Sequence, residues 1–229
     1  MIIKNKYNWM FLIFVPCIFV IWFFINKNEH KPIRTLAFFG PKNALSNPSL
    51  HNKRNDTTYH TIPPFYFTNQ FNQKVTEQTV NGKVYVTDFF FTTCRSICPV
   101  MSNSLERVYT KFKIRNDFLI LSHTVDPETD SVAPLLDYSK LHNVSDDKWL
   151  FLTGDKKSLY EVARKGYLLN ADIGSGGPDD FIHTQNFALI DKERHIRGFY
   201  DGTDNLEIKR LMNDIDLLFE EYVYKEKNK

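Results

Sequence analysis

Two cysteines, Cys94 and Cys98, lie four positions apart in the stretch FFFTTCRSICPVM, which covers residues 89–101. On one helical turn their Cα atoms would be about 6 Å apart, which is within the range for a disulfide. Their sulfurs could also converge on one soft metal ion, because thiolates favour Cu(I) or zinc. The spacing alone leaves four possibilities: an idle buried pair, a structural disulfide, a redox dithiol, or half of a metal site.

The surroundings of the pair indicate reactive thiols. Cys94 follows the apolar run 84–91, which is typical of a strand covered on both faces, and Pro99 suits the first turn of a helix. The pair should therefore lie at the carboxyl end of a parallel strand, where open α/β sheets place their sites. The unpaired N–H groups of a helix start lower a thiol pKa, and Arg95 adds positive charge. We expect both thiols to form thiolates near the surface.

Of seven histidines, His183 is the best placed to meet the cysteines. It lies in DDFIHTQNFALID, after a glycine-rich loop at residues 174–177 and directly before a second buried strand. If that strand neighbours the one that leads to Cys94, its approach loop faces the pair across the rim of the sheet. His123 is expected in the core, and His142 and His195 are expected at the surface. The remaining three, His30, His51 and His60, belong to a tether and are expected to be solvated.

From residue 61 the chain alternates strands and helices. A short hairpin with Gln73 and Lys74 at its turn is expected over residues 64–80. Apolar residues at helical spacing predict helices after Pro99, around 135–141 and 159–163, and around 211–222. Buried strands are expected at 84–91, 118–125, 149–153, 186–190 and 196–200. This order predicts a central sheet covered by helices on both faces.

Residues 9–25, WMFLIFVPCIFVIWFFI, form an apolar run without charge. The run is at the short end of what spans a hydrocarbon core of roughly 30 Å, and Trp9 and Trp22 suit the bilayer interfaces. A cleaved signal peptide is the alternative, but no small-x-small cleavage site follows. We predict an uncleaved transmembrane anchor behind a short cytoplasmic tail, residues 1–8, with Cys17 as an apolar filler in the bilayer.

The predicted domain organisation continues with a tether over residues 26–60, which carry six Lys/Arg against two acids. Within it, residues 36–39 form an apolar island that predicts one short docked strand. The folded domain is predicted over residues 61–223, with a tail at 224–229. Because residues 61–229 carry 21 Lys/Arg and 25 Asp/Glu, this part is mildly acidic, which argues against nucleic-acid binding.

Three stretches, FFFTTCRSICPVMS, SHTVDPETDS and FIHTQNFALID, in this order resemble the SCO/SenC family of copper chaperones over roughly residues 60–223. The combination of C-x-x-x-C-P with a later H-T before a strand is more specific than either part alone. The resemblance implies an α/β thioredoxin-like fold, with a central mixed sheet flanked by helices, an N-terminal hairpin extension and a single N-terminal transmembrane helix. It also implies that Cys94, Cys98 and His183 bind copper for the dinuclear copper site of cytochrome c oxidase.

The chemistry of these ligands agrees with the resemblance. Two thiolates and one neutral imidazole make a soft three-coordinate site that suits one Cu(I) per chain and can adapt to Cu(II). A third ligand on a glycine-containing loop can swing, which helps a protein that must release its metal. In the family an acid at the position of Asp126 lies close to the site. Asp126 is expected either to orient a ligand or the helix start, or to cap its loop before Pro127, whereas Asp130 is expected to be solvated.

Copper delivery would make the chain a metallochaperone rather than an enzyme. Two other functions compete with this interpretation. A membrane-tethered thiol–disulfide oxidoreductase would act on cysteines of a partner protein. Reductases of this fold use C-x-x-C opposite a Pro-Thr pair, where this chain has the longer spacing and His183-Thr184, which favours copper. A thioredoxin-like peroxidase would need one activated cysteine in a Thr/Pro-rich loop, and the second cysteine argues against it. Copper binding and dithiol exchange can coexist in one redox-active cysteine pair.

The resemblance also sets the expected location and partners. The domain should lie on the outer, periplasmic side of the inner membrane, because short N-terminal tails commonly stay inside. The expected partners are the copper-site subunit of cytochrome c oxidase and an upstream copper donor or thiol reductant.

Overall fold

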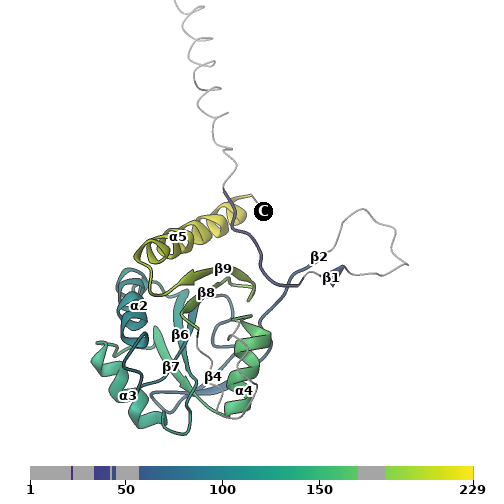
Figure 1. Cartoon of the computed structure of the whole chain (residues 1–229). Helices are drawn as coiled ribbons and strands as arrows, with labels where there is room; N and C mark the ends of the chain where they lie inside the picture. Colours follow the sequence, from purple (N-terminus) through teal and green to yellow (C-terminus); the bar gives the residue numbers. More distant parts are fainter. Residues whose placement is uncertain (1–21, 23–33, 42, 45–56, 170–183, 229) are drawn as a thin grey trace, which may run out of the picture.

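The computed structural model describes residues 22, 34–41, 43–44, 57–169 and 184–228. At its centre is a seven-stranded mixed sheet (Figure 1). The strand order is β4-β3-β7-β6-β5-β8-β9. The three central strands β7, β6 and β5 run parallel, and the outer pairings are antiparallel. The strands are β3 Tyr66–Asn69, β4 Lys74–Thr76, β5 Val84–Phe90, β6 Phe118–Thr124, β7 Trp149–Thr153, β8 Asn186–Ile190 and β9 Ile196–Asp201.

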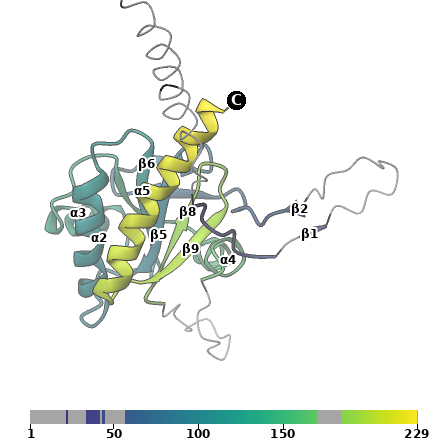
Figure 2. The same ribbon diagram turned by 90° about the horizontal axis from the view of Figure 1, so that it is seen from above.

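Helices cover both faces of this sheet (Figure 2). One core lies between the sheet and α2 (Cys98–Phe112), α3 (Val132–Leu141) and α5 (Asn205–Lys227). The second core lies between the sheet and α4 (Lys156–Glu161) with the π-helical turn η1 (Val162–Gly166). The prediction of a thioredoxin-like α/β fold, with a central mixed sheet flanked by helices and preceded by a hairpin, is confirmed.

The central position of β5 follows from its sequence. All seven of its residues are buried, as are all seven of β6. Val86 and Phe90 belong to the core under α2 and α5, whereas Tyr85 and Phe89 belong to the core under α4 and η1. A strand buried on both faces shows a continuous apolar run instead of an alternating one.

The turn of the β3–β4 hairpin lies earlier than the sequence predicted. Lys74 is the first residue of β4, and Asn72 in the turn has a φ of 59°. The Asn69 carboxamide oxygen accepts hydrogen bonds from the backbone N–H groups of Phe71 and Gln73, both at 2.9 Å. This side-chain turn closes the hairpin before Lys74.

The predicted membrane segment, residues 9–25, lies outside the described residues except for Trp22. Within the described part of the chain, no helix is both long enough and apolar enough to cross a membrane. The anchor, the cytoplasmic tail and the domain boundaries stay predictions.

The apolar island in the predicted tether docks on the folded domain. Leu36 is buried. Phe39 forms an isolated antiparallel bridge with Ile196 of β9, in which the Phe39 N–H donates to the Ile196 carbonyl at 2.9 Å. Further along, β1 (Asn43–Ala44) pairs with β2 (Thr57–Thr58). The chain therefore joins the domain near residue 36.

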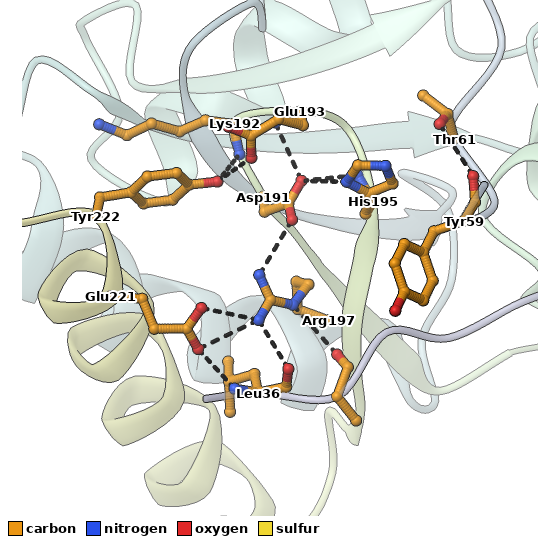
Figure 3. A network of polar contacts seen from close by, with 11 residues as sticks. Leu36, Tyr59, Thr61, Asp191, Lys192, Glu193, His195, Arg197, Glu221 and Tyr222 are labelled. Carbon is orange, nitrogen blue, oxygen red and sulfur yellow. Dashed lines mark hydrogen bonds and ion pairs between the residues drawn. The ribbon is translucent and has the colours of Figure 1, made fainter. Parts of the chain in front are cut away.

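A buried ion cluster holds this docked segment (Figure 3). Arg197 of β9 donates to the carbonyl oxygens of Leu36 at 2.8 Å and Ala37 at 3.2 Å. Its guanidinium also pairs with Asp191 at 3.1 Å and with Glu221 of α5 at 2.9 Å. Glu221 in turn accepts a hydrogen bond from the Leu36 N–H at 2.5 Å. The three charged residues are at most 2 % exposed, so each needs its partners to offset the loss of water.

We predict that Arg197→Leu lowers the free energy of unfolding by about 3–5 kcal/mol, because it leaves two buried carboxylates without their cation. Urea unfolding followed by circular dichroism measures the change. The control Arg107→Leu, at an exposed arginine of α2, should change stability by no more than about 0.5 kcal/mol. Equal effects of the two substitutions would contradict this role of the cluster.

Candidate metal centre

The two cysteines lie at the carboxyl rim of the sheet, as predicted. Cys94 is half-buried in the loop after β5, and its backbone N–H donates to the Phe91 carbonyl at 3.2 Å. Cys98 is the first residue of α2 and is 4 % exposed. Both are free thiols. A cavity of about 60 Å³ joins them to the ends of the neighbouring strands, and it is lined by Phe89, Phe90, Phe91, Cys94, Ser96, Ile97, Cys98, Val125 and Thr184.

The two thiols have opposite acidities. Burial would raise the pKa of Cys94, but hydrogen bonds from the Cys98 thiol, the Ser96 hydroxyl and the backbone lower it to about 7. Burial raises the pKa of Cys98 to about 12, and the hydrogen bond to Cys94 adds to this rise. The expectation that both thiols form surface thiolates is therefore wrong for Cys98, which α2 buries in the core. Near neutral pH about half of Cys94 is therefore thiolate, and Cys98 is a buried thiol that donates a hydrogen bond to it.

A buried carboxyl group lies behind the pair on β5. Burial raises the pKa of Asp88 to about 7, although the Ser122 hydroxyl donates to it at 2.5 Å. Trp149 Nε1 donates to the same hydroxyl at 2.8 Å. The negative charge of Asp88 contributes to the raised pKa of Cys98. Asp88 is not among the site residues predicted from the sequence, although an acid inside the apolar run 84–91 is the pattern that indicates it.

Asp130 organises the cysteine loop. The expectation that Asp130 is solvated is wrong. Asp130 is fully buried. Its carboxylate accepts hydrogen bonds from the backbone N–H of Thr92 at 3.1 Å, from the Thr92 hydroxyl, and from the Thr124 hydroxyl at 2.5 Å. It therefore ties the chain just before Cys94 to the end of β6, which fixes where the cysteine loop begins.

Asp126 lies at the same edge, half-buried after β6. Its backbone carbonyl accepts from the N–H groups of Thr129 at 3.2 Å and Asp130 at 2.8 Å, and its own N–H donates to Thr124 Oγ1 at 3.0 Å. These contacts belong to the backbone, so the choice between a ligand-orienting and a loop-capping carboxylate stays a prediction.

His183 lies outside the described residues, but its neighbour Thr184 is described and informative. Thr184 is 5 % exposed and lines the same cavity as Cys94 and Cys98. It precedes β8, which pairs antiparallel with β5 in the register Thr87↔Ala188. The strand arrangement on which the prediction for His183 depended is therefore present.

The other predicted histidine environments are partly corrected. His123 is a buried core residue with Nδ1 3.1 Å from Thr87 Oγ1, as expected. His142 is not a surface residue: it is 7 % exposed, and its Nδ1 lies 2.7 Å from Glu106, because α3 ends against α2. His195 lies with Asp191 and Glu193 in a group that could hold a metal ion. Because Asp191 already pairs with Arg197, this group is a turn braced by the ion cluster.

Comparison with known proteins decides the family. The SCO1/SenC family model matches residues 53–219. The chain belongs to the SCO1/SenC family. A Bacillus subtilis protein named SCO1 protein homolog is 32% identical over 162 residues, which are 70% of this chain and 83% of that protein.

Solved structures of SCO proteins share the fold. One of them is BsSco, a protein with a disulfide switch and a member of the Sco family of cytochrome c oxidase assembly proteins. It is 31% identical to this chain with a TM-score of 0.59, and the match covers 69% of this chain and 92% of BsSco. Arabidopsis thaliana ScoI, solved with copper bound, is 26% identical with a TM-score of 0.57, over 71% of this chain and 99% of that one.

We predict that Asp130→Asn lowers the free energy of unfolding by about 1–3 kcal/mol, because an NH₂ group would face donors at a buried acceptor position. The matched control Asp126→Asn, at a half-buried neighbour, should cost less than about 0.5 kcal/mol. Denaturant unfolding compares the two. A larger loss for the control would show that Asp126, and not Asp130, holds the loop.

The acidity difference predicts ordered alkylation. Below pH 7 Cys94 is a protonated thiol and reacts slowly, and above pH 7 it becomes the reactive thiolate, so its rate with iodoacetamide should be half-maximal near pH 7. Cys98 should stay unmodified in the folded protein. Peptide mass spectrometry separates the two sites from Cys17. Ser96→Ala should move the midpoint upward, and preferential labelling of Cys98 would refute the assignment.

Proposed function

We propose that this protein binds copper through Cys94, Cys98 and His183 and delivers it to the dinuclear copper site of cytochrome c oxidase. The observation that carries the proposal is that buried Thr184 lines the cavity of the two cysteines, because the residue next to it in sequence is the histidine. The copper-bound Arabidopsis relative and the oxidase assembly family of BsSco support the same choice of metal and client.

The described residues suit copper as a cargo. A thiolate is available at Cys94 near neutral pH, and soft sulfur ligands favour Cu(I). Cys98 must lose its proton when it binds a metal, so copper affinity should rise with pH over the range in which Cys98 is otherwise protonated. Because Cys94 is half-exposed, a ligand from a partner can approach the metal from its side, which permits transfer without full release.

The proposal includes an anchor at residues 9–25, with the domain on the periplasmic side of the inner membrane. The expected client is the copper-site subunit of the oxidase, with an upstream copper donor or thiol reductant as a second partner. One copper ion per chain follows from the single cysteine pair of the domain.

Dithiol exchange is a second candidate, favoured by the unequal acidities of the two thiols. The Cys94 thiolate would attack a disulfide of the partner, forming a mixed disulfide and releasing one partner thiolate. Cys98 would then give up its proton and attack Cys94 Sγ, which releases the second partner thiolate. The partner gains two electrons, and Cys94 and Cys98 become a disulfide.

Copper titration of the reduced protein under anaerobic conditions tests the ligand set. We predict one Cu(I) per chain, with two sulfurs and one nitrogen seen by X-ray absorption at the copper edge. His183→Ala should remove the nitrogen and weaken binding at least tenfold, because the site loses one of its three ligands. The control His195→Ala, in the Asp191–Glu193–His195 turn, should bind as the parent does. Unchanged affinity in His183→Ala would refute the ligand assignment.

Rescue of cells that lack the protein separates the two functions. Delivery predicts that excess copper restores oxidase activity, whereas dithiol exchange predicts that a membrane-permeant thiol reductant restores it. Recovery with the reductant alone would make exchange the principal function.

A further inference from the structure

We propose that the end of the domain opposite the cysteines rests on the membrane surface, so that the metal centre faces away from the bilayer. We call this end the basal face and define it as the α2–β6 loop, residues 113–117, the β8–β9 turn, residues 191–194, and the last turns of α5, residues 219–228. The inference rests on the anchor of the proposed function and adds an orientation and a lipid contact to it.

The basal face and the cysteines lie at opposite ends of β5. At the start of the strand, Val84 N–H donates to the Asp117 carbonyl at 2.9 Å, and Gly82 N–H donates to the Lys192 carbonyl at 3.3 Å. Cys94 follows the other end of the strand. The six steps of about 3.3 Å between the first and last of its seven residues separate the two ends by roughly 20 Å.

The N-terminal segment reaches the domain at the basal face. The backbone of Leu36 bonds to Glu221 and Arg197, and the Tyr222 hydroxyl of the same helix end accepts from Lys192 N–H at 3.1 Å (Figure 3). The described segment that begins at residue 34 starts beside the C-terminal part of α5 (Figure 1). The chain therefore leaves toward its N-terminus from this end and not from the cysteine rim.

The link to the predicted anchor is short. Nine peptide steps separate residue 25 from residue 34, and a fully extended chain covers at most about 3.5 Å per step, or roughly 30 Å. Because the chain docks on the domain near residue 36, most of the predicted tether, residues 26–60, does not add to the distance between the domain and the bilayer. This docking keeps the basal face within reach of the lipid headgroups at all times.

The chemistry of the basal face suits a bilayer interface. Ile114 is 85% exposed and Val223 is 52% exposed. A groove of about 590 Å³ runs along the end of α5, lined by Arg115, Asp216, Phe219, Glu220, Val223, Tyr224 and Lys227. The exposed lysines Lys113, Lys225 and Lys227 can lay their apolar stems on the interface and pair with anionic phosphates.

Nearby carboxylates make this a weak surface on its own. Glu220 and Glu226 are exposed beside the lysines, and Asp117 pairs with Arg115 and Lys192. A weak contact is sufficient here, because a short link holds the face near the membrane at an effective concentration in the millimolar range. The occupant is therefore the bilayer that carries the chain's own anchor.

The test uses the full chain in nanodiscs of equal parts phosphatidylglycerol and phosphatidylcholine, with a small fraction of nickel-chelating lipid. A ketone-bearing residue carrying a nitroxide replaces Lys113 at the basal face or Thr203 near the cysteine rim. We expect the nickel lipid to relax the label at position 113 several-fold more strongly than the label at 203. Equal relaxation, or stronger relaxation at 203, would overturn the orientation.

Paired substitutions test the surface itself. Ile114→Glu together with Val223→Glu should reduce relaxation at position 113 several-fold, whereas Leu206→Glu, at a 71% exposed leucine at the start of α5, should not. No effect of the double substitution would overturn the lipid contact, as would spin–spin broadening between two labelled copies. Failure of the chain to insert into the nanodiscs would refute the anchor and this inference. Anaerobic Cu(I) titration of the same variants is a separate measurement, in which loss of copper binding would refute the proposed function.

Discussion

The antiparallel pairing of β5 with β8 is the constraint on which the cysteine centre depends. The register Thr87↔Ala188 joins segments about a hundred residues apart in the sequence and sets the start of β8 beside the end of β5. The thiols of Cys94 and Cys98 and the side chain of Thr184 share one small cavity as a consequence. A slip of one residue in this register would turn the side chains of β8 to the opposite face of the sheet.

Burial also makes the two thiols different from each other. The start of α2 draws Cys98 into the core while Cys94 stays in the loop, which gives one acidic thiol and one that keeps its proton. Asp130 holds the entrance of that loop to β6. The centre thus combines a buried cysteine and a loop fixed to β6 with one accessible sulfur. This arrangement suits a metal or a disulfide that must be exchanged with a partner.

The sequence predicted the central part of the fold well, because strands such as β5 and β6 are buried on both faces and therefore read as continuous apolar runs. It could not predict features set by tertiary contacts. Asp130 looks like any loop acid until β6 and the cysteine loop enclose it, and His142 looks exposed until α3 packs against α2. The hairpin turn was misplaced because Asn69 bonds its own backbone locally. Docking at Leu36 was suggested by its apolar island, but its partner Arg197 lies 161 positions away.

The central claim is that an imidazole from the segment before β8 joins both sulfurs on one copper ion. The most direct measurement is a crystal structure of the reduced, copper-loaded protein, with anomalous diffraction at the copper edge to locate the metal. The account predicts a single copper peak within bonding distance of Cys94 Sγ, Cys98 Sγ and one ring nitrogen of His183. A copper peak held by the sulfurs with His183 directed away from it, or a peak at the Asp191–Glu193–His195 turn, would contradict it.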